Sequence, residues 1–173
     1  MTDNTDLKMR RMAPLATPSY QEPDAVRNIA GALNSLLADT FALYLKTKNF
    51  HWHISGHTFG ITTFCLTSRP VKYCRLQMPL PNECKRLGHH VTLNRAYCRL
   101  RRIVDNDAEY VNPPDMLSEL REDNKALALS MREVHDLCAE VGDVASTSLL
   151  EMWIDEAQRA CGFVREQAEG RLI

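Results

Sequence analysis

The chain has 173 residues, of which 45% are hydrophobic and 25% are charged, and its formal net charge is −1. This length suits one compact domain with a sizeable core, and the small net charge excludes a strong overall field that would draw the chain to nucleic acid. No apolar run approaches the roughly 18 residues that span a bilayer, and the N-terminus lacks the apolar stretch of a secretory signal. These features predict a cytoplasmic protein with no membrane partner.

Residues 1–23 are polar and rich in Pro, Thr and Ser, which predicts a flexible N-terminal tail. The basic residues of this tail are Lys8, Arg10 and Arg11. The alternative interpretation is a basic arm that contacts DNA phosphates. Because three basic residues can neutralise only a few phosphates, such binding would be weak and sensitive to salt.

The spacing of apolar residues predicts three long helices. Apolar residues recur three and four positions apart over 24–54, 114–141 and 144–168, which gives each segment one apolar stripe. Gly142 suits the end of the second helix, and Asp143 can cap the third. Helices of this length are typical of a bundle, so we predict an all-α fold and expect a fourth helix in the middle of the chain.

The middle segment, residues 57–98, does not have the pattern of a helix. Glu83 is its only acidic residue against six Lys and Arg, and neither a 3.6-residue nor a 2-residue period is present. Three prolines each disfavour a helix interior by roughly 3 kcal/mol. So long a stretch without structure is uncommon inside a regular domain. The prolines are Pro70, Pro79 and Pro81, and four of the chain's six cysteines also lie here: Cys65, Cys74, Cys84 and Cys98.

A zinc site is one interpretation of the middle segment. Its metal-capable residues include Cys65, Cys74, Cys84, His89 and His90, separated in turn by eight, nine and four residues up to His89. Structural zinc sites favour pairs separated by two to four residues. The spacing therefore favours incidental cysteines over zinc.

Four stretches outside the middle segment carry a resemblance to a known family. They read LNSLLADTFALYLKTKNFHWHISG (33–56), RIVDNDAEYV (102–111), DMLSELREDNKAL (115–127) and GDVASTSLLEMWIDEAQR (142–159). The elements KNFHW and DMLSELREDN are the most specific. These stretches resemble the Dps family, the DNA-binding proteins from starved cells.

The resemblance implies a ferritin-like four-helix bundle over residues 24–170, with the second helix disrupted or absent in this sequence. It also implies a homo-oligomer of twelve subunits that forms a hollow shell. Members of the family oxidise ferrous iron with peroxide or oxygen, store the mineral inside the shell, and in some cases bind DNA. Iron is therefore the expected metal.

The resemblance places an iron site between two subunits. The histidine that the family supplies from its first helix matches His51, whereas a lone helical histidine without this motif would be interpreted as a surface or core residue. The other ligands are expected at positions 63, 67, 78 and 82. This chain has Thr63, Thr67, Met78 and Asn82 there, and none is a convincing iron ligand.

Acidic residues at the last helix have two interpretations. The resemblance implies that Asp143, Glu151 and Asp155 line an acidic pore at the threefold axis, through which iron reaches the interior. The alternative is that these residues cap the helix and cover its solvated faces.

The genetic code offers an explanation for the middle segment. Allowed codons for Thr58 to Cys74, read from the third base of each, give FRDYHLLLDEQAGQIL, and the same shift over Gln77 to Cys84 gives DAIAERV. Both strings have helical periodicity, with acids and a histidine at the family spacing. Two bases of most codons are fixed by the protein, so this agreement is not easily accidental. We infer an out-of-frame translation restored near Arg99, with one further slip within residues 86–98.

Three functions therefore compete. The first is an iron-oxidising and iron-storing protein that protects DNA under oxidative or starvation stress. The second is a DNA-binding module without ferroxidase activity. The third is an inactive, poorly folded product of a frameshifted gene, because losing one helix of a bundle exposes the apolar stripes of the others.

The frameshift is tested by sequencing the source gene across codons 56 to 99. An uninterrupted frame would restore the missing ligands and predict an ordinary iron-oxidising shell. A genuine slip would leave one ligand of the site, and we then expect no ferroxidase activity and little soluble shell by gel filtration.

Overall fold

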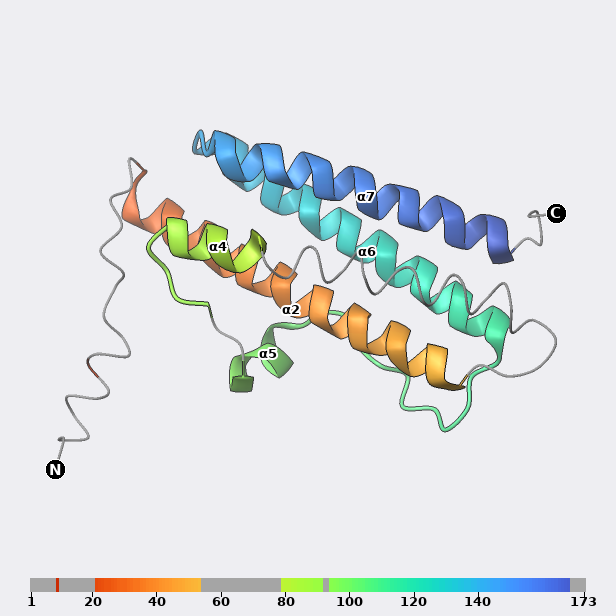
Figure 1. The fold of residues 1–173 in the computed structure, drawn as a ribbon. Helices are drawn as coiled ribbons and strands as arrows, with labels where there is room; N and C mark the ends of the chain where they lie inside the picture. The colour runs from red at the N-terminus through yellow and green to blue at the C-terminus, as the bar shows by residue number, and fades with distance from the viewer. Residues whose placement is uncertain (1–8, 10–20, 54–78, 92–93, 169–173) are drawn as a thin grey trace, which may run out of the picture.

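The computed structural model describes Met9 and residues 21–53, 79–91 and 94–168 (Figure 1). The predicted tail over 1–23 lies almost entirely outside these residues, together with Lys8, Arg10, Arg11, Thr63, Thr67 and Met78. The described residues contain helices and no strand: α2 (Pro23–His53), α4 (Pro79–Arg86), α5 (Asn94–Leu100), α6 (Pro113–Glu140) and α7 (Val144–Ala168). The all-α prediction is confirmed.

The three long helices form where the apolar spacing predicts them. The predicted 114–141 is α6, shifted by one residue, and the predicted 144–168 coincides with α7. The predicted 24–54 is α2, which begins one residue earlier, at Pro23, and position 54 lies outside the described residues. Figure 1 shows α6 and α7 side by side along their length, joined by a tight turn, with α2 along the other side of α6.

The core lies between these helices because each turns its apolar stripe toward the others. On α2 the stripe is fully buried over four turns. Residues from α6 and α7 close the same core. Its fully buried side chains include Ile29, Leu33, Leu36, Leu37 and Leu43 of α2, Met116, Leu120, Leu127 and Met131 of α6, and Leu150 of α7.

The ends of α6 are defined by its own sequence. Asn112 caps the first turn, where its side-chain oxygen accepts a hydrogen bond from the backbone N–H of Asp115 at 3.1 Å. At the other end Gly142 adopts a φ of 71°, which glycine tolerates at low cost. The N–H of Asp143 then bonds to the carbonyl of Cys138 at 2.9 Å, as in a Schellman turn.

The described part of the middle segment contains a short helix, α4, that the sequence analysis did not predict. Pro79 and Pro81 do not break a helix; they lie in the first turn of α4, where a backbone N–H has no intrahelical partner to lose. A short helical period is also present, since Leu80, Cys84 and Leu87 are all buried at four- and three-residue spacing. The expectation that no period remains was therefore wrong for this stretch.

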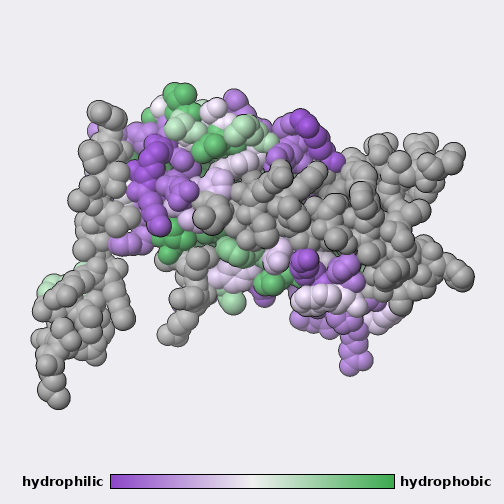
Figure 2. Space-filling model, viewed as in Figure 1, coloured by the Kyte–Doolittle hydropathy of each residue, from purple (hydrophilic) through white to green (hydrophobic). Residues whose placement is uncertain are grey.

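Helix α4 packs its apolar side on α2 and turns its polar side outward (Figure 2). The Sγ of Cys84 lies 3.9 Å from the carbonyl oxygen of Ala30, which shows how closely the two helices approach. Asn82 and Lys85 are exposed on the opposite side. The described residues thus replace the expected second long helix with eight residues of α4 and seven of α5. This agrees with a ferritin-like bundle whose second helix is disrupted.

Among the described residues, no helix is both long enough and apolar enough to cross a membrane.

Replacing Leu80 by alanine tests whether α4 is part of the core. Leu80→Ala removes a fully buried side chain, so we expect the free energy of unfolding to fall by about 3 kcal/mol. Urea denaturation followed by circular dichroism measures the change. Leu129→Ala is the matched control, because Leu129 on α6 is 59% exposed and its loss should change stability little. Equal effects of the two substitutions would show that α4 does not pack on the core.

Candidate functional site

His51 lies in the last turn of α2 and is partly buried. Its Nδ1 atom is buried and has no hydrogen-bond partner among the described residues. The neighbouring side chains differ, because Phe50 packs in the core whereas Trp52 is 70% exposed. A buried imidazole nitrogen without a partner can accept a metal ion or a water molecule.

The other family positions do not complete a metal site. Asn82 is exposed on α4, and its amide is a weak ligand; Thr63, Thr67 and Met78 lie outside the described residues. Within the described part of the chain, no group of three or more His, Cys, Asp or Glu side chains could hold a metal ion. His51 is therefore not part of such a group among the described residues.

A buried lysine lies one turn before this histidine. The side chain of Lys46 is only 8% exposed, and its Nζ lies 3.0 Å from Glu119 and 2.8 Å from Asp123, both on α6. Burial opposes the charge of Lys46, but the hydrogen bonds and attraction of the two carboxylates outweigh it and raise the pKa of the ammonium. For the Asp123 carboxyl, burial is the largest effect and raises the pKa, although the nearby Lys46 ammonium acts to lower it. We call Lys46, Glu119 and Asp123 the lysine cluster.

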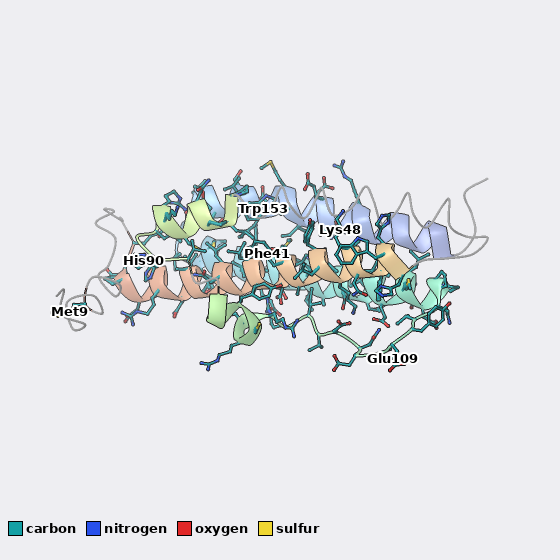
Figure 3. All side chains as sticks on the ribbon, turned by 60° about the horizontal axis from the view of Figure 1, so that its bottom comes forward. Met9, Phe41, Lys48, His90, Glu109 and Trp153 are labelled. Atoms are coloured by element: carbon teal, nitrogen blue, oxygen red, sulfur yellow. The ribbon has the colours of Figure 1, made fainter. Side chains whose placement is uncertain are left out.

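The segment between α5 and α6, residues 101–112, is hydrogen-bonded to α2 at Asp39. Asp39 is 1% exposed, and its carboxylate accepts hydrogen bonds from the backbone N–H groups of Arg102 (2.5 Å) and Ile103 (3.2 Å). The Nε of Arg102 donates a third bond at 3.0 Å. A buried carboxylate is tolerated when its oxygens are bonded in this way. We refer to residues 101–112 as the 101–112 loop; Glu109 lies on its outer side (Figure 3).

Two small hollows lie between the C-terminal half of α2 and this loop. One has a volume of about 210 Å³ and is lined by residues that include Leu45, Lys46, Asn49 and Val104. The other has a volume of about 120 Å³ and lies farther along the helix, against Asn49, Phe50 and His53 and against loop residues from 105 to 111. The loop therefore covers one side of the C-terminal half of α2, and His51 lines neither hollow.

The residues predicted for a pore have ordinary partners in this chain. Asp143 is 3% exposed and accepts two hydrogen bonds from Arg86 of α4, at 2.8 and 2.9 Å. Its carboxylate also accepts a bond from the N–H of Ser146 at 3.4 Å, so Asp143 caps α7 as the alternative interpretation expects. Glu151 is exposed 3.7 Å from His135, and Asp155 is exposed and pairs with Arg159. The pore itself stays a prediction.

Of the three cysteines in the zinc interpretation, Cys84 alone lies among the described residues, and its burial can be compared with that of Cys98 and Cys138. Burial raises the pKa of the thiols of Cys84 and Cys138 to about 12, because a thiolate is poorly solvated in the core. Cys98 is exposed on the surface, and Cys65 and Cys74 lie outside the described residues. Among the described residues, Cys84 is not grouped with two other His, Cys, Asp or Glu side chains that could hold a metal ion.

Sequence reasoning missed the lysine cluster and Asp39. Both Asp39 and Lys46 fall on the buried side of a helix whose neighbouring positions are apolar, and they are seven residues apart. A charged residue within an apolar stripe requires a partner. That signal was available in the sequence, but it does not identify the partners.

The sequence model of the ferritin-like domain family matches residues 84–170, about half of the chain. The "DNA protection during starvation protein" of Helicobacter pylori is 25% identical over 130 residues, which cover 74% of this chain and 90% of that protein. Antigen TpF1 of Treponema pallidum is 24% identical over 136 residues, covering 78% of this chain and 77% of that protein.

Solved structures match the fold. DpsC from Streptomyces coelicolor aligns with a TM-score of 0.83 at 22% identity, covering 90% of this chain and 91% of that chain. The Dps protein of Vibrio cholerae, described as a member of a broad superfamily of ferritin-like diiron-carboxylate proteins, aligns with a TM-score of 0.75 at 22% identity. It covers 90% of this chain and 98% of that chain.

Cysteine labelling tests the burial of the thiols. At pH 8 a thiol with a pKa of about 12 is ionised to roughly one part in ten thousand, so iodoacetamide should modify Cys98 long before Cys84 or Cys138. Peptide mapping by mass spectrometry measures each rate. All three should react alike in denaturant, which serves as the control. Rapid labelling of Cys84 in the folded chain would contradict its place in the core.

Proposed function

The chain belongs to the ferritin-like family, and on that premise we propose that the protein is a Dps-type subunit of a cytoplasmic shell that oxidises and stores iron. The observation that carries the proposal is His51, within the KNFHW element at the end of α2, with a buried Nδ1 that has no hydrogen-bond partner among the described residues. Imidazole together with hard oxygen ligands suits iron. In this proposal iron is the substrate and the stored cargo.

The ligand set as written does not fit iron oxidation. One imidazole cannot hold iron with open positions for an oxidant, and Asn82 offers only an exposed amide. We therefore assign the activity to the frame-corrected chain, whose shifted strings carry a histidine and acids at the family spacing. For the chain as written, we expect no iron oxidation at this position.

Assembly is the second part of the proposal. A site completed by a neighbouring subunit requires a homo-oligomer, and the family resemblance implies twelve copies. Two exposed apolar side chains on the outer face of α7, Val144 and Met152, suit contacts between subunits. The earlier expectation that the chain as written assembles poorly stays a prediction.

DNA protection is a second candidate function. The name of the Helicobacter pylori relative supports it, and the basic residues Lys8, Arg10 and Arg11 supply a small phosphate-binding arm. The shell would then associate with the nucleoid. With a net charge of −1 per chain, binding would depend on the arm and would weaken as the salt concentration rises.

Iron oxidation by three proteins tests the proposal: the chain as written, the frame-corrected chain, and the frame-corrected chain with His51→Ala. Absorbance of ferric iron after addition of Fe²⁺ and peroxide measures the rate. We expect the frame-corrected chain to oxidise iron and the chain as written to stay at the uncatalysed rate. His51→Ala should slow the frame-corrected chain by roughly tenfold or more, since a ligand is lost.

The matched control is His135→Ala in the frame-corrected chain. His135 is a partly exposed histidine of α6 that contacts surface acids rather than the end of α2, so its loss should leave the rate unchanged. A frame-corrected chain that oxidises iron equally well without His51 would refute the assignment of this ligand.

A further inference from the structure

The lysine cluster joins three parts of the described structure at one ammonium group. Lys46 comes from α2, Glu119 and Asp123 come from successive turns of α6, and the carbonyl oxygen of Val104 in the 101–112 loop accepts a bond from Nζ at 3.3 Å. Burying an ammonium is costly unless it is paired and hydrogen-bonded. The two carboxylates and the carbonyl therefore fix where the Lys46 ammonium lies. The ammonium in turn holds these three groups together.

The 101–112 loop is attached to the same cluster by a second bond. The amide of Asn106 donates to Glu119 at 2.6 Å, so the loop contacts both the ammonium and one of its carboxylates. The other attachment is at Asp39, seven residues earlier on α2. Positions seven apart lie on one side of a helix. The loop thus follows one side of α2, with Lys46 as the attachment nearer to His51.

The loop reaches the last turn of α2. Loop residues from 105 to 111 line the smaller hollow together with Asn49, Phe50 and His53, the residues around His51. The Nζ of Lys46 also lies 5.9 Å from the centre of the Phe50 ring, within reach of a cation–π contact. A terminal helical turn opens easily unless other groups pack against it. Here Val111 of the loop packs against the core cluster that contains Phe50 of that turn.

We infer that Lys46 is a positioning residue: its ammonium holds the 101–112 loop against α2 and thereby fixes the terminal turn from which His51 projects. The relevance of this turn to iron rests on the proposed function, but the positioning does not. The role depends on charge, because without the ammonium Glu119 and Asp123 would face each other, with Asp105 nearby, and repel.

Hydrogen–deuterium exchange of the chain as written tests the inference without any metal. Lys46→Met keeps most of the apolar stem and removes the charge. We expect exchange to rise by roughly tenfold in peptides covering 101–112 and in peptides covering the last turn of α2. Exchange in the middle of α6 and α7 should stay unchanged.

Two further variants separate the charge from general damage. Lys125→Met is the matched control, because Lys125 is an exposed α6 lysine paired with Glu122 on its own helix, and its loss should leave both regions unchanged. Lys46→Arg keeps a cation and should restore most of the protection that Lys46→Met loses. If Lys46→Met fails to fold, Glu119→Gln replaces it and should increase exchange in the same two regions.

Three results would overturn the inference. The first is faster exchange in the loop with an unchanged last turn of α2, which would separate the loop from the His51 turn. The second is unchanged exchange in both regions. The third is an equal effect of Lys46→Met and Lys125→Met. A failure of the proposed iron oxidation would leave these exchange results as they are, so the two ideas fail separately.

Discussion

The structure depends on covering the apolar stripe of α2. This helix is buried on several sides along most of its length, and a helix in that state is stable only when other elements exclude water from it. The α6–α7 pair covers one side. On the other side, Leu80, Cys84 and Leu87 of the α4 region fill part of the place that a long second helix would take. Eight residues of helix can do this because hydrophobic burial is not directional.

Two charged residues within that stripe determine how the 101–112 loop lies. Asp39 accepts hydrogen bonds from two backbone N–H groups and a guanidinium. Lys46 forms ion pairs with two carboxylates and donates a hydrogen bond to a backbone carbonyl. Each would be strongly unfavourable without its partners. The same stripe that forms the core therefore also specifies the path of a loop with few buried side chains. Arg86 plays a comparable part for α4, which it binds to the start of α7 through Asp143.

The long helices could be predicted from the sequence because their information is local. Apolar spacing, Gly142 and the cap at Asn112 lie within the elements that they define. The bonds of Lys46 and Asp39 could not be predicted, because their partners are distant in the chain and no periodicity connects them. Helix α4 was missed for a different reason: prolines were counted as helix breakers, although the first turn accepts them. His51 could be named only through the resemblance, since its spacing alone has no chemical meaning.

The difference between burial and coordination explains how the described residues can form a ferritin-like fold without bringing together three side chains that could hold a metal ion. Packing needs apolar side chains of about the right size, and the altered segment happens to supply three of them at helical spacing. A metal site needs particular donor atoms at fixed positions, and the reading-frame shift that we infer from the codons would replace those donors with unrelated residues. Helix α4 illustrates the difference: its apolar side chains are buried in the core, whereas Asn82 is exposed at a position where the family resemblance implies an acid. The side of α4 that packs is compatible with the fold, whereas Asn82 does not supply the acidic ligand that the family resemblance implies at this position.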